Sequence, residues 1–470
     1  MIIWFRQNLR LHDNPVLHYA AAQKTPLLLV YIDDDTPQPW RHGGASRWWL
    51  HHSLMRLAAD LQERYQAKLH IFQGEPLAII SDLLAKTKAQ AIAWDRCYEP
   101  FAIQRDTHIK KTLTSMGIDA KSFNTALLKE PWETLNKSEQ PFKVFTPFWR
   151  NIQTLAMRDI LPLPQKFESS QIKGSLSVDE CVPLPSIPWY ETMAKTWEPG
   201  EQGAKNNLSQ FLKKTLKDYK LLRNRPDLVH TSRLSPHLHF GEISPIQVWH
   251  AAMSVHEHRN DRDCFLSELA WREFSYHLLY HFPHLPEAPF KPAFGAFPWK
   301  KSKSLLKKWQ QGQTGYPIVD AGMRELWHTG WMHNRVRMVV ASFLIKHLLQ
   351  PWQQGEAWFW DTLVDADLAN NAASWQWVAG CGADAAPYFR IFNPVLQGEK
   401  FDPNGDYVRK WVPELAKLPN KYLHAPWEAP QDELLKAEVR LGKTYPHPSV
   451  EHAKARETAL AAYQDIRTQS

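Results

Sequence analysis

Residues 1–125 alternate short apolar runs with amphipathic stretches, which is typical of a parallel sheet with helical crossovers. Four apolar runs are predicted to be strands, at 2–5, 27–32, 69–72 and 91–94. Helical periodicity lies between them, for example over 47–65 and 76–85. We therefore predict a doubly wound, Rossmann-like α/β domain over residues 1–128. It carries neither G-x-G-x-x-G nor G-x-x-x-x-G-K-[ST], so a standard dinucleotide or triphosphate site is not indicated.

The pattern changes after residue 128. Residues 129–204 concentrate prolines among Ser and Gly, which indicates an inter-domain connector with little regular structure. From 205 to 470 helical periodicity dominates and strand signals vanish, so we expect a large all-α domain. Its clearest helical windows are 268–279 and 331–349, and a short helical piece is expected at 459–470.

Composition narrows the function only slightly. A net charge of +7 over 470 residues permits a polyanionic partner without requiring one. The four cysteines form no C-x-x-C pair, and the N-terminus lacks a signal-peptide layout, so a cytoplasmic protein with reduced thiols is expected. No apolar run is long enough to span a membrane. The 22 tryptophans could pack in the core, stack on the bases or sugars of a ligand, or pass electrons along a redox relay.

An acid, an indole and a guanidinium share one face of the first helical window. Glu268, Trp271 and Arg272 are spaced i, i+3 and i+4, with Phe265 one turn earlier. Burying such charges is costly, so this face is either a surface ion pair beside a half-buried Trp or the wall of a pocket that stacks a planar ligand.

Two further segments offer similar alternatives. On a helix over 331–338, Arg335 and Arg337 would point to different sides. In one interpretation, one arginine binds a phosphate and the other pairs with a buried acid. In the other, both lie on the solvated edge of an amphipathic helix. In 365–377, Asp365 and Asp367 lack the other positions of a calcium loop, so no metal site is expected and a structural role, such as capping a helix or pairing with Arg337, is favoured.

A third segment, 231–235, places Thr231, Ser232 and Ser235 near a helix start. Its hydroxyls fit ordinary helix caps or a phosphate cradle.

In their order along the chain, these segments resemble the photolyase/cryptochrome family, and most closely its class I-like cyclobutane pyrimidine dimer photolyases. The matching segments are W-F-R-Q-N-L-R-L-H-D-N at 4–14, K-V-F-T-P-F-W at 143–149, T-S-R-L-S at 231–235, W-R-E-F at 271–274, T-G-Y-P-I-V-D at 314–320, G-W-M-H-N-R at 330–335, the run 365–377, and Y-F-R-I-F-N-P at 388–394. The resemblance implies an antenna-type domain at 1–128, a connector at 129–204 and an FAD-binding, DNA-repair domain at 205–470. It further implies light-dependent repair of cyclobutane pyrimidine dimers in single- or double-stranded DNA by electron transfer from photoexcited reduced FAD.

The resemblance also assigns roles to residues. Those implied to hold FAD are Tyr219, Thr231, Ser232, Arg233, Leu234, Ser235, Phe265, Glu268, Arg272, Asn334, Arg337, Asp365, Asp367 and Asn371. Those implied to contact the flipped dimer or its flanking phosphates are Arg223, Trp271, Asn334, Arg335, Met338, Trp377, Arg390 and Lys400. Glu268 would bond the dimer carbonyl, Asn371 would face flavin N5, Arg337 would pair with Asp365, and an electron chain would run through Trp375, Trp352 and Trp299.

Other members of the family remain as alternatives. A (6-4) photolyase typically has paired histidines near 334–338, and a cryptochrome is a blue-light photoreceptor that often carries a C-terminal extension. A family-independent alternative is a helical single-strand binder. A second antenna chromophore, methenyltetrahydrofolate or a deazaflavin, is possible, although Phe101 and Ala102 replace the Asn-Glu pair of folate-binding relatives. Another flavin or an empty pocket also remains open. The resemblance implies a monomer in a bacterial-type cytoplasm, on the nucleoid when bound to DNA.

Overall fold

The computed structural model describes residues 1–468 and divides the chain into two compact units. The first unit comprises 1–217, 232–283 and 364–367, and the second comprises 218–231, 284–363 and 368–470. Segments 205–217, 232–283 and 364–367 of the predicted helical domain thus belong to the first compact unit. The predicted domain boundaries at 128 and 204 stay a prediction.

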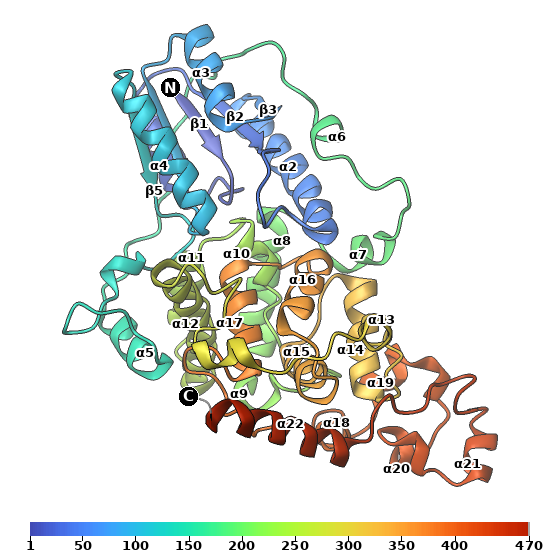
Figure 1. Ribbon diagram of the computed structural model, residues 1–470. Helices are drawn as coiled ribbons and strands as arrows, with labels where there is room; N and C mark the ends of the chain where they lie inside the picture. The colour runs from blue at the N-terminus through green and yellow to red at the C-terminus, as the bar shows by residue number, and fades with distance from the viewer. Residues whose placement is uncertain (469–470) are drawn as a thin grey trace. The chain divides into compact units, whose positions relative to one another are not determined.

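The first unit contains a five-stranded parallel sheet in the order β3-β2-β1-β4-β5 (Figure 1). The strands are β1 (Ile2–Phe5), β2 (Leu28–Asp33), β3 (Leu69–Gln73), β4 (Ala91–Asp95) and β5 (Asp119–Phe123). Helices α1 (Pro15–Ala22), α2 (Gly44–Tyr65), α3 (Pro76–Thr87) and α4 (Pro100–Ser115) connect them. This confirms the predicted α/β fold and its four strands to within one residue at each end; β5 was not predicted.

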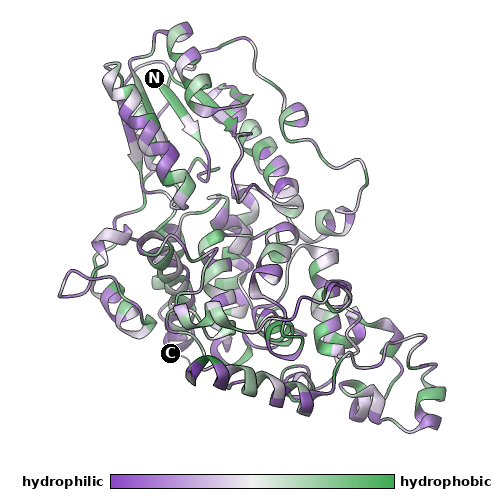
Figure 2. Ribbon diagram, in the orientation of Figure 1, coloured by the Kyte–Doolittle hydropathy of each residue, from purple (hydrophilic) through white to green (hydrophobic). Residues whose placement is uncertain are grey.

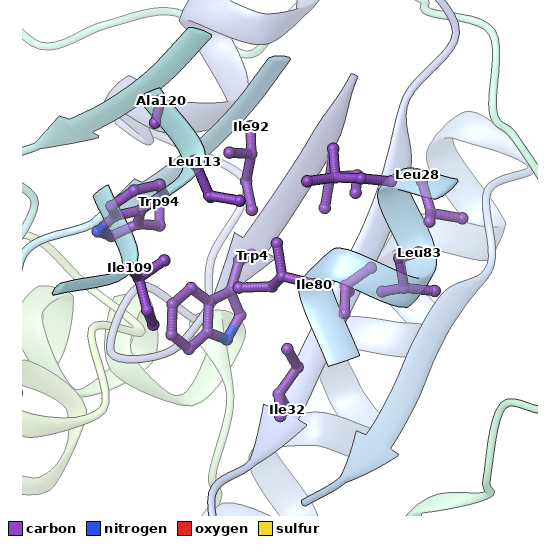
Figure 3. Close-up of a cluster of buried hydrophobic side chains, with 13 residues drawn as sticks. Trp4, Leu28, Ile32, Ile80, Leu83, Ile92, Trp94, Ile109, Leu113 and Ala120 are labelled. Carbon is purple, nitrogen blue, oxygen red and sulfur yellow. The ribbon is translucent and has the colours of Figure 1, made fainter. Parts of the chain in front are cut away.

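The sheet core explains why these apolar runs are continuous. Trp4 and Trp94 lie on neighbouring strands with ring centroids 6.1 Å apart, and Ile80 of α3 and Ile109 of α4 pack over the same cluster (Figure 3). Strands covered on both faces need apolar residues at successive positions, and Figure 2 shows β1 as mostly hydrophobic.

The remaining helices of the first unit lie in the predicted connector and in the predicted helical domain. They are α5 (Phe145–Thr154), α6 (Val178–Cys181), α7 (Glu191–Thr196), α8 (Glu201–Gln210), α10 (Ser235–His239), α11 (Pro245–Met253) and α12 (Arg259–His281). The connector therefore holds more helix than expected, although its segment 155–177 has none.

The elements of regular structure described in the second unit are helices joined by loops. Its helices are α9 (Tyr219–Leu222), α13 (Lys303–Gln310), α14 (Pro317–Thr329), α15 (Asn334–Ser342), α16 (Trp352–Thr362), α17 (Leu368–Ala379), α18 (Pro394–Phe401), α19 (Asp406–Trp411), α20 (Asn420–Leu423), α21 (Gln431–Lys436) and α22 (His452–Thr468). The predicted helical window 331–349 contains α15, which begins at Asn334, followed by a π-helical turn over Phe343–His347. Within residues 1–468, no helix has both the length and the apolar character that crossing a membrane requires.

A buried arginine organises the loop after β1. The Arg10 guanidinium is fully buried and donates to the carbonyl oxygens of His12, Asp13, Thr125 and Gly241. Position 241 must be glycine, because a Cβ there would lie 1.9 Å from the carbonyl oxygen of Gln7 and the backbone φ is +66°.

Asp13 complements this arginine. Its carboxylate accepts hydrogen bonds from the Arg158 guanidinium, the backbone N–H of Leu161 and the Ser244 hydroxyl. These bonds lower the pKa of Asp13, although burial alone would raise it. The conspicuous segment 4–14 is therefore a structural hub that joins the sheet to the connector and to the start of α11.

Candidate functional site

Helix α12 carries the first predicted constellation. Glu268, Trp271 and Arg272 are half-buried on it, which fits the wall of a pocket better than a solvated surface. Phe265, one turn earlier, is buried and packs on Phe211 with ring centroids 4.5 Å apart. The helix forms here because apolar residues recur every three to four positions and bury its other face.

A buried anion lies in the same unit as α12. Asp367 accepts hydrogen bonds from the Tyr276 hydroxyl and from Nδ1 of His239, the latter at 3.4 Å. Burial alone would raise the pKa of Asp367, but the His239 hydrogen bond and the charges of His239 and Arg272 lower it below its usual value. Asp367 is therefore ionised at neutral pH. The pairing explains its burial, and the sequence pattern did not reveal His239 or Tyr276.

The pKa of Glu273, which follows Arg272 in the chain, is shifted in the opposite direction to that of Asp367. Burial raises the pKa of Glu273 to about 7, against the charge of Arg272 and the backbone N–H of Leu128, which donates at 2.9 Å. A folded-state pKa above the ordinary 4.5 means that the folded chain holds this proton more tightly than the unfolded chain. The stabilising contribution is fully present below about pH 4.5 and is lost as the pH rises through 7.

Replacing Glu273 with glutamine should therefore change the pH dependence of stability. Glutamine keeps an oxygen acceptor for Leu128 but cannot ionise, so the variant should gain stability relative to the wild type as the pH rises from 5 to 8. Urea unfolding across this range measures the difference, with a ceiling of about 1.4 kcal/mol per pH unit. A stability difference that does not change with pH would contradict the assignment.

Segment 231–235 does not cap a helix, contrary to one of the two interpretations above. Helix α10 begins at Ser235 with Leu234 as its N-cap, and no side chain bonds its free N–H groups. Leu234 is buried and Ser235 is exposed. Among the residues described, the hydroxyls of Ser232 and Ser235 have no hydrogen-bond partner, which fits the phosphate-binding interpretation.

In the second unit, α17 and α16 pack together around the predicted residue Asn371. Asn371 is buried, and its Nδ2 donates to the backbone carbonyl of Glu356 at 3.0 Å. The Glu356 carboxyl is fully buried, and neither of its oxygens has a hydrogen-bond partner within residues 1–468. Burial and the charge of Glu287 raise its pKa well above its ordinary value, which favours the protonated form. Glu356 was not predicted from the sequence, because a single acid among the aromatic residues of α16 forms no recognisable motif.

Each unit, taken by itself, holds groups of a kind that bind parts of a flavin dinucleotide. In the first unit, the hydroxyls of Ser232 and Ser235 suit a phosphate. In the second unit, the buried Glu356 carboxyl without a partner suits a polar heterocycle that offers hydrogen-bonding atoms. When bound, FAD would supply light absorption and electron transfer.

The predicted tryptophan chain lies in the second unit. Trp375 and Trp352 are buried, and Trp299 is half-buried against Phe297 at 4.3 Å between ring centroids. Trp375 packs on Phe359 at 5.0 Å. A partly exposed end suits contact with a reductant in solution, and the order of electron transfer stays a prediction.

Gly355 leaves room for the Trp375 ring. A Cβ at position 355 would lie 2.1 Å from a ring carbon of Trp375, so Gly355→Ala must displace the indole. We expect a loss of about 1–3 kcal/mol in unfolding free energy and slower photoreduction of bound FAD. Gly295→Ala is the control, because no atom lies within 4 Å of the added carbon. If this variant photoreduces FAD at the wild-type rate, Trp375 does not take part in electron transfer to the flavin.

Two of the four predicted phosphate ligands lie over one ring. The Arg335 guanidinium and the Lys400 ammonium lie 4.6 and 5.3 Å from the centroid of Phe401. Arg335 also donates twice to Oδ1 of Asn224, and its pKa is lowered by burial and then by the charge of Arg223. Arg390 is exposed, and its backbone carbonyl accepts a hydrogen bond from the Lys346 ammonium at 3.0 Å.

Five further predicted residues lie on helices of the second unit. Tyr219 of α9 is buried beneath the Arg223 guanidinium, and Trp377 of α17 is half-buried. On α15, Asn334 is exposed and Met338 half-buried, and Arg337 donates to the carbonyl of Met332. The pairing of Arg337 with Asp365 joins residues of the two units and stays a prediction.

Comparison with known proteins agrees with this geometry. A family model for DNA photolyase matches residues 1–167, and one for the FAD binding domain of DNA photolyase matches residues 265–465. A deoxyribodipyrimidine photo-lyase of Agrobacterium fabrum is 48% identical, covering 99% of this chain and 98% of that protein. Cryptochrome-1 of Arabidopsis thaliana is 38% identical, covering 97% of this chain and 69% of that protein.

A solved structure gives the same result. A bacterial class III photolyase from Agrobacterium tumefaciens superposes with a TM-score of 0.96 at 49% identity, covering 99% of this chain and 97% of that one. An FAD-binding domain is therefore present. With matches along nearly its whole length, the chain belongs to the DNA photolyase and cryptochrome family.

Proposed function

We propose that this protein is a deoxyribodipyrimidine photo-lyase, which splits cyclobutane pyrimidine dimers in DNA with the energy of light. The observation that carries the proposal is the near-complete match to a relative of that name, in a chain that keeps a half-buried acid and indole together on α12. Reduced FAD, when bound, supplies the electron that opens the cyclobutane ring.

The chain's own residues would bind and orient the dimer. Trp271 and Trp377 are proposed to stack on its two rings, with Asn334 and Met338 completing the pocket. Glu268 is proposed to donate a hydrogen bond to a dimer carbonyl and to stabilise the negative charge that develops there. A damaged pair costs less to flip out of the duplex than an intact one, which contributes to selectivity.

The remaining assignments concern the flavin and the DNA backbone. Asn371 is the proposed partner of flavin N5, and Ser232 and Ser235 of a phosphate. The basic cluster Arg223, Arg335 and Lys400 is proposed to contact the phosphates that flank the dimer, together with Arg390. Such contacts release counterions, so affinity should fall as the salt concentration rises.

The α/β domain is a proposed site for a second chromophore. The strand order reverses between β1 and β4, and ligands of doubly wound sheets bind at the carboxyl ends of the strands at such a point. Arg6 and Glu99 follow these two strands. Two nitrogens of Arg6 and one oxygen of Glu99 have no hydrogen-bond partner in the described chain. Absorption bands beyond those of FAD in the purified protein would identify the chromophore.

Binding measurements separate the candidate functions. Purified, FAD-loaded protein would be titrated under red light with three oligonucleotides, bearing a cyclobutane thymine dimer, a (6-4) photoproduct or no damage. The proposal predicts the tightest binding to the cyclobutane dimer. Preference for the (6-4) lesion would identify a (6-4) photolyase, and no preference would favour a cryptochrome-type photoreceptor. We further propose a monomer in the cytoplasm that joins the nucleoid when bound to DNA.

A further inference from the structure

The indole of Trp271 is held by a second aromatic ring. The rings of Phe145 and Trp271 are nearly parallel, with centroids 3.8 Å apart and an interplanar angle of 9°. Phe274 meets the same indole edge-on at 5.7 Å. One face of Trp271 is therefore covered and its edge is fixed, while the side chain as a whole remains half-buried.

Phe145 lies in the predicted connector, 129–204, and not in the predicted helical domain that contains Trp271. It is the first residue of α5 and is 8% exposed. One turn later, Phe148 packs on Phe274 at 5.2 Å and on His277 at 5.2 Å. Helix α5 thus lies along α12, and only its first ring covers Trp271.

A neutral histidine fixes the loop that leads into α5. Nε2 of His277 accepts from the backbone N–H of Phe142 at 2.9 Å, and its Nδ1 lies 3.1 Å from the Thr134 hydroxyl oxygen. Burial lowers the pKa of His277 to about 3, so the ring carries a single proton. With Nε2 as acceptor that proton is on Nδ1 and is donated to Thr134, whose hydroxyl donates to the carbonyl of Pro131.

We propose that Phe145 is a positioning residue for dimer recognition. By covering one face of Trp271, it holds the indole in the orientation in which the opposite face stacks on a flipped dimer. The connector then takes part in substrate selection although it lies outside the FAD-binding match at 265–465. This inference rests on the proposed function. Because stacked aromatic pairs add a modest free energy beyond their burial, loss of the pair should weaken dimer binding about 2- to 10-fold.

The test compares three variants of the full-length, FAD-loaded protein. Phe145→Leu keeps much of the apolar volume but removes the stacked ring, and Phe145→Tyr restores it. Phe148→Leu is the matched control on the same helix, because Phe148 packs on Phe274 and His277 and has no ring contact with Trp271. Each variant is titrated with dimer-containing and undamaged oligonucleotides, and its thermal midpoint is measured.

Of the three variants, only Phe145→Leu is expected to bind the dimer more weakly than the wild type. Its affinity for undamaged DNA and its repair per absorbed photon at saturating dimer should equal those of the wild type. Phe145→Tyr should bind the dimer like the wild type. Wild-type affinity in Phe145→Leu, or equal losses in Phe145→Leu and Phe148→Leu, would overturn the inference. A wild-type protein that does not prefer the dimer at all would instead overturn the proposed function.

Discussion

Replacing Arg10 with methionine is expected to lower the free energy of unfolding by about 3–5 kcal/mol, which is a large part of the stability of a typical domain. The Arg10 guanidinium satisfies four backbone carbonyl oxygens in a site with no access to water. Methionine fills a similar volume but donates no hydrogen bond. The four carbonyl oxygens therefore lose their donor, and the Asp13 carboxylate loses a neighbouring positive charge. Burial lowers the pKa of Arg10 to about 10, so the wild-type side chain is still charged at neutral pH.

The measurement is urea unfolding followed by far-ultraviolet circular dichroism. Arg259→Met is the control, because Arg259 is 80% exposed and its ion pair with Asp263 lies on the surface. That variant should stay within about 0.5 kcal/mol of the wild type. If Arg10→Met unfolds at the same urea concentration as the control, the loop after β1 is not the structural hub described above.

Replacing Trp271 with alanine is expected to weaken binding to a cyclobutane dimer about 5- to 150-fold. Stacking of a base on an aromatic side chain contributes about 1–3 kcal/mol, which converts to that range of affinity. Affinity for undamaged DNA should change little, because the phosphate contacts assigned to Arg223, Arg335 and Lys400 remain.

Trp327 provides the control for this substitution. It is 55% exposed and stacks on Trp358 at 6.0 Å, so Trp327→Ala also removes a large exposed ring but from no proposed site. Fluorescence anisotropy with labelled oligonucleotides under red light measures both variants. Equal losses for damaged and undamaged DNA in Trp271→Ala would contradict a stacking role and indicate a general disturbance of α12.

Local patterns predicted the sheet because its strands are buried on both faces and therefore read as continuous apolar runs. Strand β5 was missed for the opposite reason. Its sequence, Asp-Ala-Lys-Ser-Phe, exposes two of five residues at the edge of the sheet and contains no apolar run. The change from α15 to a π-helical turn was not predicted, because no Gly or Pro marks it in the sequence Phe343–His347.

The candidate site could be predicted only where the residues carry a recognisable motif. Glu268, Trp271 and Asn371 lie in such motifs, and their helices were confirmed, while their roles stay proposals. His239, Glu356 and the contact of Phe145 with Trp271 could not be read from spacing, because each depends on which segments fold together. Other motif residues are structural: Asp320 accepts from the Thr314 hydroxyl and from the Tyr445 hydroxyl and so joins distant parts of the second unit.

Reversal of a defined lesion by light tests the central claim most directly. Purified, photoreduced protein would be mixed with DNA that bears a single cyclobutane thymine dimer, and restored thymines would be counted after blue light and in a dark control. The account predicts complete restoration in the light and none in the dark. Intact dimers after illumination of FAD-loaded, reduced protein that binds the lesion would contradict it.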